Sequence, residues 1–548
     1  MVDDPQDSND NSGDDGGGGG GGFSGSSGSS GGGGGLGNLL NFLPLVFGLF
    51  GNRNSGNTGS NGNSKGGCGF STIIIVLVLA AVAYYFFFNG QGCNSEGLSG
   101  LTNAVSKFTR GGTLDPNEFK KASIYEGLEN DNSKNPLPES VSLLKFAPDR
   151  QNQGKQGSCV AWSSGYAART IIESASTAQN ANSIAFSPAF LYSQIGLDGC
   201  QGSYIIKAMQ FMTNKGALPF NQFPYDENNC SRQPTNALLS QAAQYKMHGF
   251  NRLTEGDAVT NLSLRAIKEH LSKDAPVVIG MMVGGTFMEG MLGQKVWHPT
   301  QSDYNQTGFG GHALCVIGYD DRLDGGAFQI MNSWGTQWGE NGIGWIRYRD
   351  CPSFVREAYG IDPMPKRGAA LNVAFECTIG LVNNESKQYI PLKVASSNTF
   401  TTSSPVKKGT KFKIEIKNAL ECYIYLFTPN AAGVSFVLFP YKPAHSPYCG
   451  ITGYRLFPKG QSIRADSIGS KDYMGIVVSK DPLDYNAVNN AISNSSASTY
   501  GAKLNEAIAA TSIKNVKYSN TNNGGIYFKA DSTDKNKIVG CVVEIEKQ

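Results

Sequence analysis

The stretch QNQGKQGSCVAW, residues 151–162, decides the fold of the middle of this chain. Cys159 follows a glycine and a serine, and the apolar residues from Cys159 to Ser174 recur at helical spacing, which predicts a helix that begins at the cysteine. A thiol at a helix N-terminus meets the positive end of the aligned peptide dipoles. We therefore expect the pKa of this thiol to be lowered and its nucleophilic thiolate to be favoured.

Gln153 lies on the loop that leads into this helix. Its side-chain amide and the backbone N–H of Cys159 are placed to donate to the same oxygen, and together they would form a two-donor oxyanion hole. The loss of one such donor costs about 3–4 kcal/mol of transition-state stabilisation.

A thiolate nucleophile needs an imidazole nearby, and the chain has only 5 histidines: His248, His270, His298, His312 and His445. We expect His248 and His298 in loops, His270 at the end of the polar face of a helix, and His445 in a separate domain. His312 differs from these because GGHALCVIGY places it at the start of an apolar strand, where its ring can face a cleft. His312 is therefore the candidate base.

The imidazole needs a third group to fix its orientation. Asn332 in MNSWGTQWGENG lies on the next strand-like segment and is the candidate for that role. Trp334 is on the same strand face and would shelter an Asn–His hydrogen bond from water. For Trp338 and Cys315 we expect only buried packing.

These segments resemble the papain-like cysteine peptidases, whose patterns are Q-G-x-x-G-S-C, G-x-H-A and N-S-W-G-x-x-W-G. The order of cysteine, histidine and asparagine matches, and the histidine follows the cysteine by about 150 residues, as expected. The resemblance implies an α+β fold with a helical lobe and a β-barrel-like lobe. It also implies hydrolysis of protein or peptide substrates through an acyl-enzyme on Cys159, with Cys159, His312, Asn332 and Gln153 as catalytic residues and no cofactor.

The same resemblance extends to GCQGS, where Gly202 and Ser203 would line the groove and bind the substrate backbone. The chain departs from the family pattern at Gln156, which stands where a cysteine is usual, and at Val160, which stands where a tryptophan is usual. Cys200 therefore lacks its customary partner, and either it pairs with Cys230 or both are free. No helical inhibitory propeptide is recognisable before the domain.

The chain divides by composition into five parts. Residues 1–69 are rich in Gly, Ser and Asn and are expected to be disordered, residues 89–136 read as a linker, and residues 137–366 hold the peptidase-like motifs, with helices first and strands later. Residues 367–548 are predicted to form a β-rich, sandwich-like domain with a helical insertion near residues 485–512. This last part is loosely similar to an uncharacterised β-rich module of bacterial enzymes, so we assign it binding or positioning work, with a binding partner of its own, and expect a bacterial source.

Residues 70–88 carry no charge and, as a helix, would span about 28 Å, close to the ~30 Å hydrocarbon core of a bilayer. We predict one transmembrane helix here. Arg53 and Lys65 precede the span, and the first positive residue after it is Lys107, so the positive-inside rule places the body outside the cytoplasm.

Bulk composition excludes some functions. The 46 basic residues nearly cancel the 44 acidic ones without a basic run, so nucleic-acid binding is not expected. The 11 cysteines are spread too thinly for a disulfide scaffold. Two alternatives to peptide hydrolysis stay open: acyl transfer to an amine by the same residues, and a catalytically silent module used for binding or assembly at the cell envelope.

Overall fold

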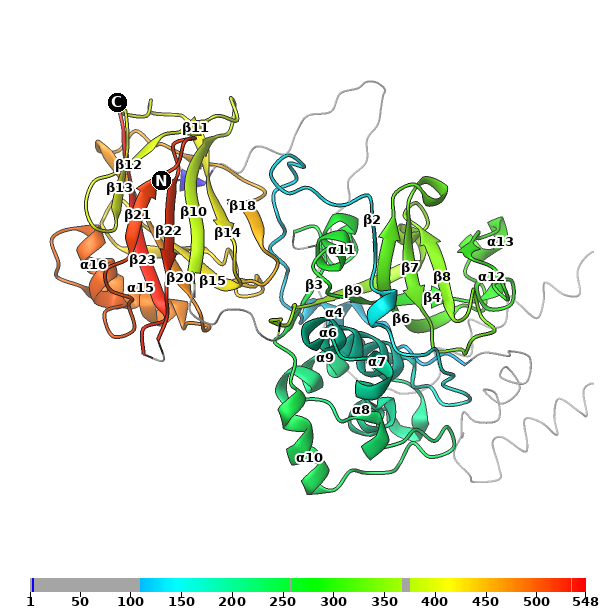
Figure 1. The fold of residues 1–548 in the computed structure, drawn as a ribbon. Helices are drawn as coiled ribbons and strands as arrows, with labels where there is room; N and C mark the ends of the chain where they lie inside the picture. The colour runs from blue at the N-terminus through cyan, green and yellow to red at the C-terminus, as the bar shows by residue number, and fades with distance from the viewer. Residues whose placement is uncertain (1, 4–108, 257, 367–374, 534) are drawn as a thin grey trace, which may run out of the picture. The chain divides into compact units, whose positions relative to one another are not determined.

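The computed structural model describes residues 2–3, 109–256, 258–366, 375–533 and 535–548 (Figure 1). The predicted transmembrane segment 70–88 and, apart from Val2 and Asp3, the predicted disordered tail lie outside these residues. None of the helices in the described ranges is both long and apolar enough to cross a bilayer.

Helices dominate the chain from Cys159 to Ala242. They are α5 (Cys159–Ala161), a π-helix (Trp162–Arg169), α6 (Thr170–Thr177), α7 (Ala181–Ile184), α8 (Pro188–Ile195), α9 (Ile205–Asn214) and α10 (Asn236–Ala242). The first three run on without a break, so the long helix predicted from Cys159 is present, with a π-helical middle. The buried inward faces of these helices include Ile171, Phe190 and Met209.

All but one of the strands in the next sheet follow the helices, and the sheet has eight strands. Figure 1 shows it beside α6–α9. The order is β3 (Phe250–Arg252), β9 (Val355–Ile361), β4 (Val277–Val283), β6 (Gly310–Asp320), β7 (Ala327–Met331), β8 (Ile343–Arg347) and β5 (Val296–Trp297), with β2 (Ser140–Ser142) paired to β6. The short helices of this half are α11 (Leu264–Leu271), α12 (Gly285–Met288), α13 (Gln301–Tyr304) and α14 (Cys351–Phe354). The predicted α+β order of helices first and strands later is confirmed.

Strand β6 lies in the middle of this sheet, between β4 and β7. Its residues from His312 to Tyr319 are all buried, which explains why ALCVIGY reads as a continuous apolar run rather than an alternating one. Cys315 is fully buried on this strand and Trp338 is fully buried nearby, as predicted for both. The central strand therefore gives His312 a rigid support.

The described end of the predicted linker, residues 109–136, is a packed segment. It carries helix α4 (Pro116–Lys120), and Phe119, Ile124, Tyr125 and Leu128 are all buried. Phe119 packs edge-on against Tyr359 of β9, with ring centroids 5.1 Å apart. These apolar residues are too widely spaced to give a periodic signal, so the polar residues between them concealed a packed segment.

The C-terminal region is β-rich, as predicted, and consists of two sheets. One has the order β1 (Val2–Asp3), β19 (Ile463–Arg464), β14 (Lys411–Asn418), β10 (Phe375–Asn383), β22 (Ile526–Ala530) and β21 (Lys517–Asn520), with β11 (Tyr389–Ile390) and β18 (Gly453–Phe457) at its sides. The other has the order β12 (Leu392–Val394), β13 (Thr399–Thr402), β23 (Ile538–Glu546), β20 (Lys471–Ser479), β15 (Cys422–Pro429) and β16 (Ser435–Phe439), with β17 (Tyr448–Cys449) paired to β15.

One apolar core lies between the two sheets. It joins Ile379 and Ile414 of the first to Leu426, Met474 and Val543 of the second. Helices α15 (Tyr485–Asn494) and α16 (Tyr500–Ala507) fall within the predicted helical insertion and cover the outer face of the second sheet, where Ile492 and Leu504 are buried.

Candidate active site

Cys159 is the first residue of α5, and its side chain is fully buried. The residues before it form a tight turn in which Ser158 N donates to Gln156 O at 2.8 Å. The Ser158 hydroxyl does not cap the helix but bonds the hydroxyl of Tyr225 at 2.7 Å. The first-turn amides of the helix are thus left free of a side-chain cap next to the thiol.

His312 and Asn332 are joined by a hydrogen bond. His312 Nε2 lies 2.9 Å from Asn332 Oδ1, and the backbone N–H of Ser333 donates to the same oxygen at 2.7 Å. Because that second donor identifies the Asn332 atom as the carbonyl oxygen, Nε2 carries the ring hydrogen. Nδ1 of His312 is buried with no hydrogen-bond partner in the described part of the chain, so it remains available as a base.

Trp334 covers this pair. Its ring stacks on the His312 ring with centroids 4.3 Å apart and an interplanar angle of 26°. Phe287 and Trp338 both pack edge-on against Trp334, each at a centroid distance of 6.0 Å. The indole therefore lies over the His–Asn pair. That it shelters their hydrogen bond from water stays a prediction.

Gln153 is fully buried and held from three directions. Its Oε1 accepts from the Ser333 hydroxyl at 2.6 Å, its Nε2 donates to Gln156 O at 2.9 Å, and its backbone O accepts from Tyr225 at 2.7 Å. A primary amide has two hydrogens, so one remains after the bond to Gln156. Ser333 and Tyr225 thus fix the orientation of Gln153, although no sequence pattern singled them out.

Burial favours the neutral form of both the thiol and the imidazole. Burial raises the pKa of the Cys159 thiol to about 12, although the backbone N–H groups of Ala313, Val160 and Gly111 act in the opposite direction. Burial also lowers the pKa of His312 to about 4, against the hydrogen bond to Asn332, which favours the protonated ring. The expected lowering of the Cys159 pKa is therefore wrong for this state, because desolvation outweighs the helix end.

The chain itself covers the thiol. Residues 109–115, TRGGTLD, run between Ser203 on one side and Gly311 on the other, and we call them the strap. Ser203 N donates to Gly111 O and Thr113 N donates to Ser203 O, both at 3.0 Å, and Gly112 N donates to Gly311 O at 3.0 Å. Ser203 thus bonds a backbone segment of the chain itself, and a Cβ on its neighbour Gly202 would lie 2.4 Å from Gly111 O. That these two residues bind a substrate backbone stays a prediction.

The remaining sequence expectations are resolved as follows. Cys200 and Cys230 form a disulfide, with Cα atoms 6.1 Å apart. His270 is not on a polar face but fully buried, with Nδ1 2.8 Å from Ala266 O and its ring edge-on to Tyr125. His270 is buried on α11 because the segment that contains Tyr125 covers it. The sequence of the helix alone does not indicate this covering segment.

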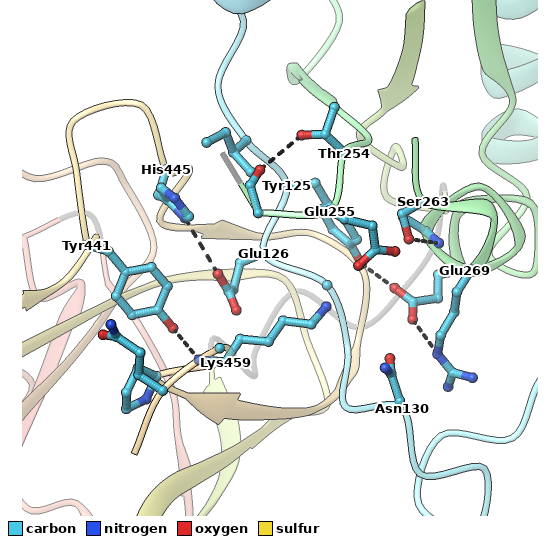
Figure 2. A pocket seen from close by; sticks show the side chains of 18 of the residues that line it. Tyr125, Glu126, Asn130, Thr254, Glu255, Ser263, Glu269, Tyr441, His445 and Lys459 are labelled. Carbon is cyan, nitrogen blue, oxygen red and sulfur yellow. Dashed lines mark hydrogen bonds and ion pairs between the residues drawn. The ribbon is translucent and has the colours of Figure 1, made fainter. Parts of the chain in front are cut away.

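A cavity of about 370 Å³ lies away from the thiol, and none of the candidate site residues lines it. Figure 2 shows Tyr125, Glu126 and Asn130 passing between Thr254, Ser263 and Glu269 on one side and Tyr441, His445 and Lys459 on the other. The described residues include no group of His, Cys, Asp and Glu that could hold a metal ion.

Comparisons with known proteins find similarity to cysteine proteases. The sequence model of the papain family cysteine proteases matches residues 143–361. Mouse cathepsin K is 24% identical over 212 residues, which cover 38% of this chain and 58% of cathepsin K. Cathepsin B-like CP2 of Giardia intestinalis is 27% identical over 227 residues, which cover 38% of this chain and 68% of that protein.

Among solved structures, xylellain, a cysteine protease from Xylella fastidiosa, is 21% identical with a TM-score of 0.39, covering 47% of this chain and 97% of xylellain. Of mouse cathepsin K, by contrast, this chain spans little more than half the length. The β-rich C-terminal region lies beyond the residues that the family model matches.

Proposed function

We propose, from the premise that residues 143–361 are a papain-family cysteine protease domain, that this chain hydrolyses peptide bonds in proteins or peptides with Cys159 as nucleophile. The observation that carries the proposal is the ordered set of groups around the thiol. A fully buried cysteine begins a helix, and the Ala313 amide beside His312 acts to lower the pKa of its thiol. His312 is in turn bonded to Asn332.

The chemistry follows from these contacts. With a substrate in the groove, His312 Nδ1 takes the thiol proton and the Cys159 sulfur attacks the peptide carbonyl carbon. The same nitrogen then gives that proton to the leaving amine, and the peptide C–N bond breaks to leave a thioester. Water, deprotonated by His312, adds to the thioester carbonyl, and the acid product leaves with the thiol restored. The reaction needs no cofactor.

Two hydrogen-bond donors are available for the substrate carbonyl oxygen, which becomes negative in each step. They are the backbone N–H of Cys159 and the second amide hydrogen of Gln153, whose side chain Ser333 and Gln156 hold in place. Because Gln153 is fixed before the reaction, it needs no reorganisation when the charge develops. Its contribution should therefore be to rate and not to substrate binding.

Gln153→Ala should lower kcat by about 10²-fold and leave substrate affinity nearly unchanged, because the donor meets an oxyanion only in the transition state. Steady-state kinetics on a peptide substrate would give the rate effect, and direct binding in a Cys159→Ala background would give the affinity. Lys155→Ala on the same loop is the matched control, since its side chain is exposed. An unchanged kcat in Gln153→Ala would remove the oxyanion role and favour a binding module.

We also propose that residues 70–88 tether this protease to a membrane with its catalytic domain outside the cytoplasm. Support comes from the absence of charge over this segment and from the position of Arg53 and Lys65 before it. Protease added to intact cells should degrade the domain that contains Cys159 and spare the N-terminal tail. Degradation of the tail with the domain spared would reverse the topology, and recovery of the whole chain in the supernatant after lysis would contradict the tether.

A further inference from the structure

We propose that the cavity of about 370 Å³ shown in Figure 2 binds a small zwitterion, namely an amino acid or a dipeptide with both ends free. Three stretches of chain line it: residues 124–130 after the strap, residues 254–269, which run into α11, and residues 441–461 of the β-rich region. None of the groups assigned to peptide hydrolysis takes part, so the site goes beyond the function proposed above.

Glu126 supplies the observation that points to a ligand. Its side chain is only 3% exposed, and its Oε1 accepts no hydrogen bond from the described residues. Figure 2 shows Glu126 in the cavity wall, directed toward His445, whose Nδ1 lies 3.8 Å from Oε2. A buried carboxylate oxygen is nearly always paired, because burial removes its bonds to water. A donor group on a molecule in the cavity would pair Oε1.

Lys459 brings the opposite charge to the same cavity. Its side chain is exposed and lines the cavity. A Cβ on Gly127, the residue after Glu126, would lie 2.5 Å from Lys459 Nζ and 3.7 Å from Glu269 Oε2. The ammonium therefore lies against the backbone next to Glu126, and the absence of a side chain at position 127 leaves room for it. An acid group on a ligand can bond Lys459 while its amino group bonds Glu126.

Glu269 and Arg265 also line the cavity but are already paired with each other. Arg265 Nε donates to Glu269 Oε1 at 3.0 Å. Glu269 Oε2 accepts from the Tyr125 hydroxyl at 3.1 Å and from Leu128 N at 3.2 Å. Burial raises the pKa of Glu269, and the positive charge of Lys459 acts in the opposite direction. This carboxylate thus faces Lys459 with a donor on each of its oxygens, and the acceptor left for a ligand is that of Glu126.

The presence of both signs of charge decides the class of ligand. A simple anion would place a second negative charge beside Glu126, and a simple cation would meet the Lys459 ammonium. Glu255 and Lys442, both exposed, add one more charge of each sign. A molecule with an ammonium and a carboxylate a few bonds apart matches both walls.

The size of the cavity limits the ligand to one or two amino-acid residues. Its volume of about 370 Å³ is near the lower end of the range for ligand pockets, which is about 300–1,000 Å³. Free amino acids and the short peptides that a protease releases share this chemistry, so both are probes for the site.

Calorimetric titration of the full-length Cys159→Ala chain tests the proposal without cleavage of the probe. Alanine or Ala-Ala should bind at one site per chain with a Kd of about 1 mM or tighter, and comparing the two separates an amino acid from a peptide as the ligand. Acetylated Ala-Ala lacks the ammonium, and Ala-Ala amide lacks the carboxylate. Each should bind at least about 10-fold more weakly than the free form, because each loses a charge-assisted hydrogen bond.

Two variants locate the binding in this cavity. Glu126→Gln keeps the shape of the side chain and removes its charge, and Lys459→Met removes the charge of an exposed residue, which keeps the test valid if Glu126→Gln fails to fold. Each should weaken binding of the tighter probe by at least about 10-fold. Glu385→Gln and Lys408→Met are the matched controls, because both side chains are exposed and neither lines the cavity, and they should leave Kd unchanged.

Three results would overturn the site. They are the binding of neither probe, equal affinity for free and blocked Ala-Ala, and binding that neither Glu126→Gln nor Lys459→Met weakens, which would lie elsewhere in the chain. None of these measurements uses hydrolysis, so a failure here leaves the proposed peptidase function standing, and a failure of Cys159 as nucleophile leaves the cavity site standing.

Discussion

Cys159→Ala is expected to abolish peptide hydrolysis, with a loss on the order of 10⁶-fold. Without the sulfur no acyl-enzyme forms, and neither His312 nor Gln153 can replace it. The fold should persist, because the change removes one atom from the first turn of a helix that continues for several turns beyond it. Turnover of a fluorogenic peptide measures the loss.

Cys315→Ala is the matched control. Cys315 is as fully buried as Cys159 and lies on the same strand as His312, but burial raises the pKa of its thiol and no N–H group opposes this. It should keep full activity, and an epoxide thiol inhibitor should mark Cys159 and leave Cys315 unmodified. The tryptophan fluorescence of both variants should match the parent, since all 5 tryptophans lie between residues 162 and 345. Activity that survives Cys159→Ala would contradict the nucleophile assignment.

The site residues whose role depends on a particular type of side chain could be predicted from the sequence. Cys159 at a helix start, His312 at a strand start and Asn332 after the next strand each leave a pattern of residue types, and the structure brings the last two within 2.9 Å. The α+β order and the β-rich C-terminal region could be predicted for the same reason, because hydrophobic periodicity reports which face of a segment is buried.

The strap could not be predicted, because it is held mainly through its backbone. Its bonds to Ser203 and Gly311 are made by N–H and C=O groups that every residue other than proline has, and Gly111 and Gly112 contribute only the absence of a side chain. A Gly-Gly pair in a polar stretch is typical of a loop. The prediction of a lowered pKa for Cys159 is wrong for the same reason, because the thiol is buried by a segment that is remote in sequence.

Two further features could not be predicted from the sequence, for physical reasons. The sequence of the helix alone predicts a position on the polar face for His270, whereas Tyr125 from the segment after the strap covers its ring. The π-helix from Trp162 to Arg169 differs from an α-helix by its hydrogen-bond partners, which residue types do not specify. In both cases tertiary packing decided what local pattern left open.

His312→Ala and Asn332→Ala should differ in size and in pH dependence. Loss of the base should remove nearly all hydrolysis, whereas loss of the Asn332 hydrogen bond should cost about 10–150-fold, the value of about 1.5–3 kcal/mol for a bond to a charged group. Burial lowers the pKa of His312 and the Asn332 oxygen raises it, because that oxygen accepts from Nε2–H and favours the protonated ring. Removing the oxygen lowers this pKa further, so the acid limb of kcat/KM, where the imidazole gains a proton and can no longer act as a base, should move to lower pH.

Asn332→Asp provides the opposite case with the same geometry. The carboxylate keeps an acceptor for His312 Nε2 and for the Ser333 N–H, and its negative charge favours the imidazolium more strongly than an amide does. Its acid limb should therefore move to higher pH while kcat stays closer to the parent value than in Asn332→Ala. The measurement is a pH profile of kcat/KM for the three chains. Limbs that coincide in all three would mean that Asn332 does not act through His312, and equal, complete losses in His312→Ala and Asn332→Ala would place the orienting group elsewhere.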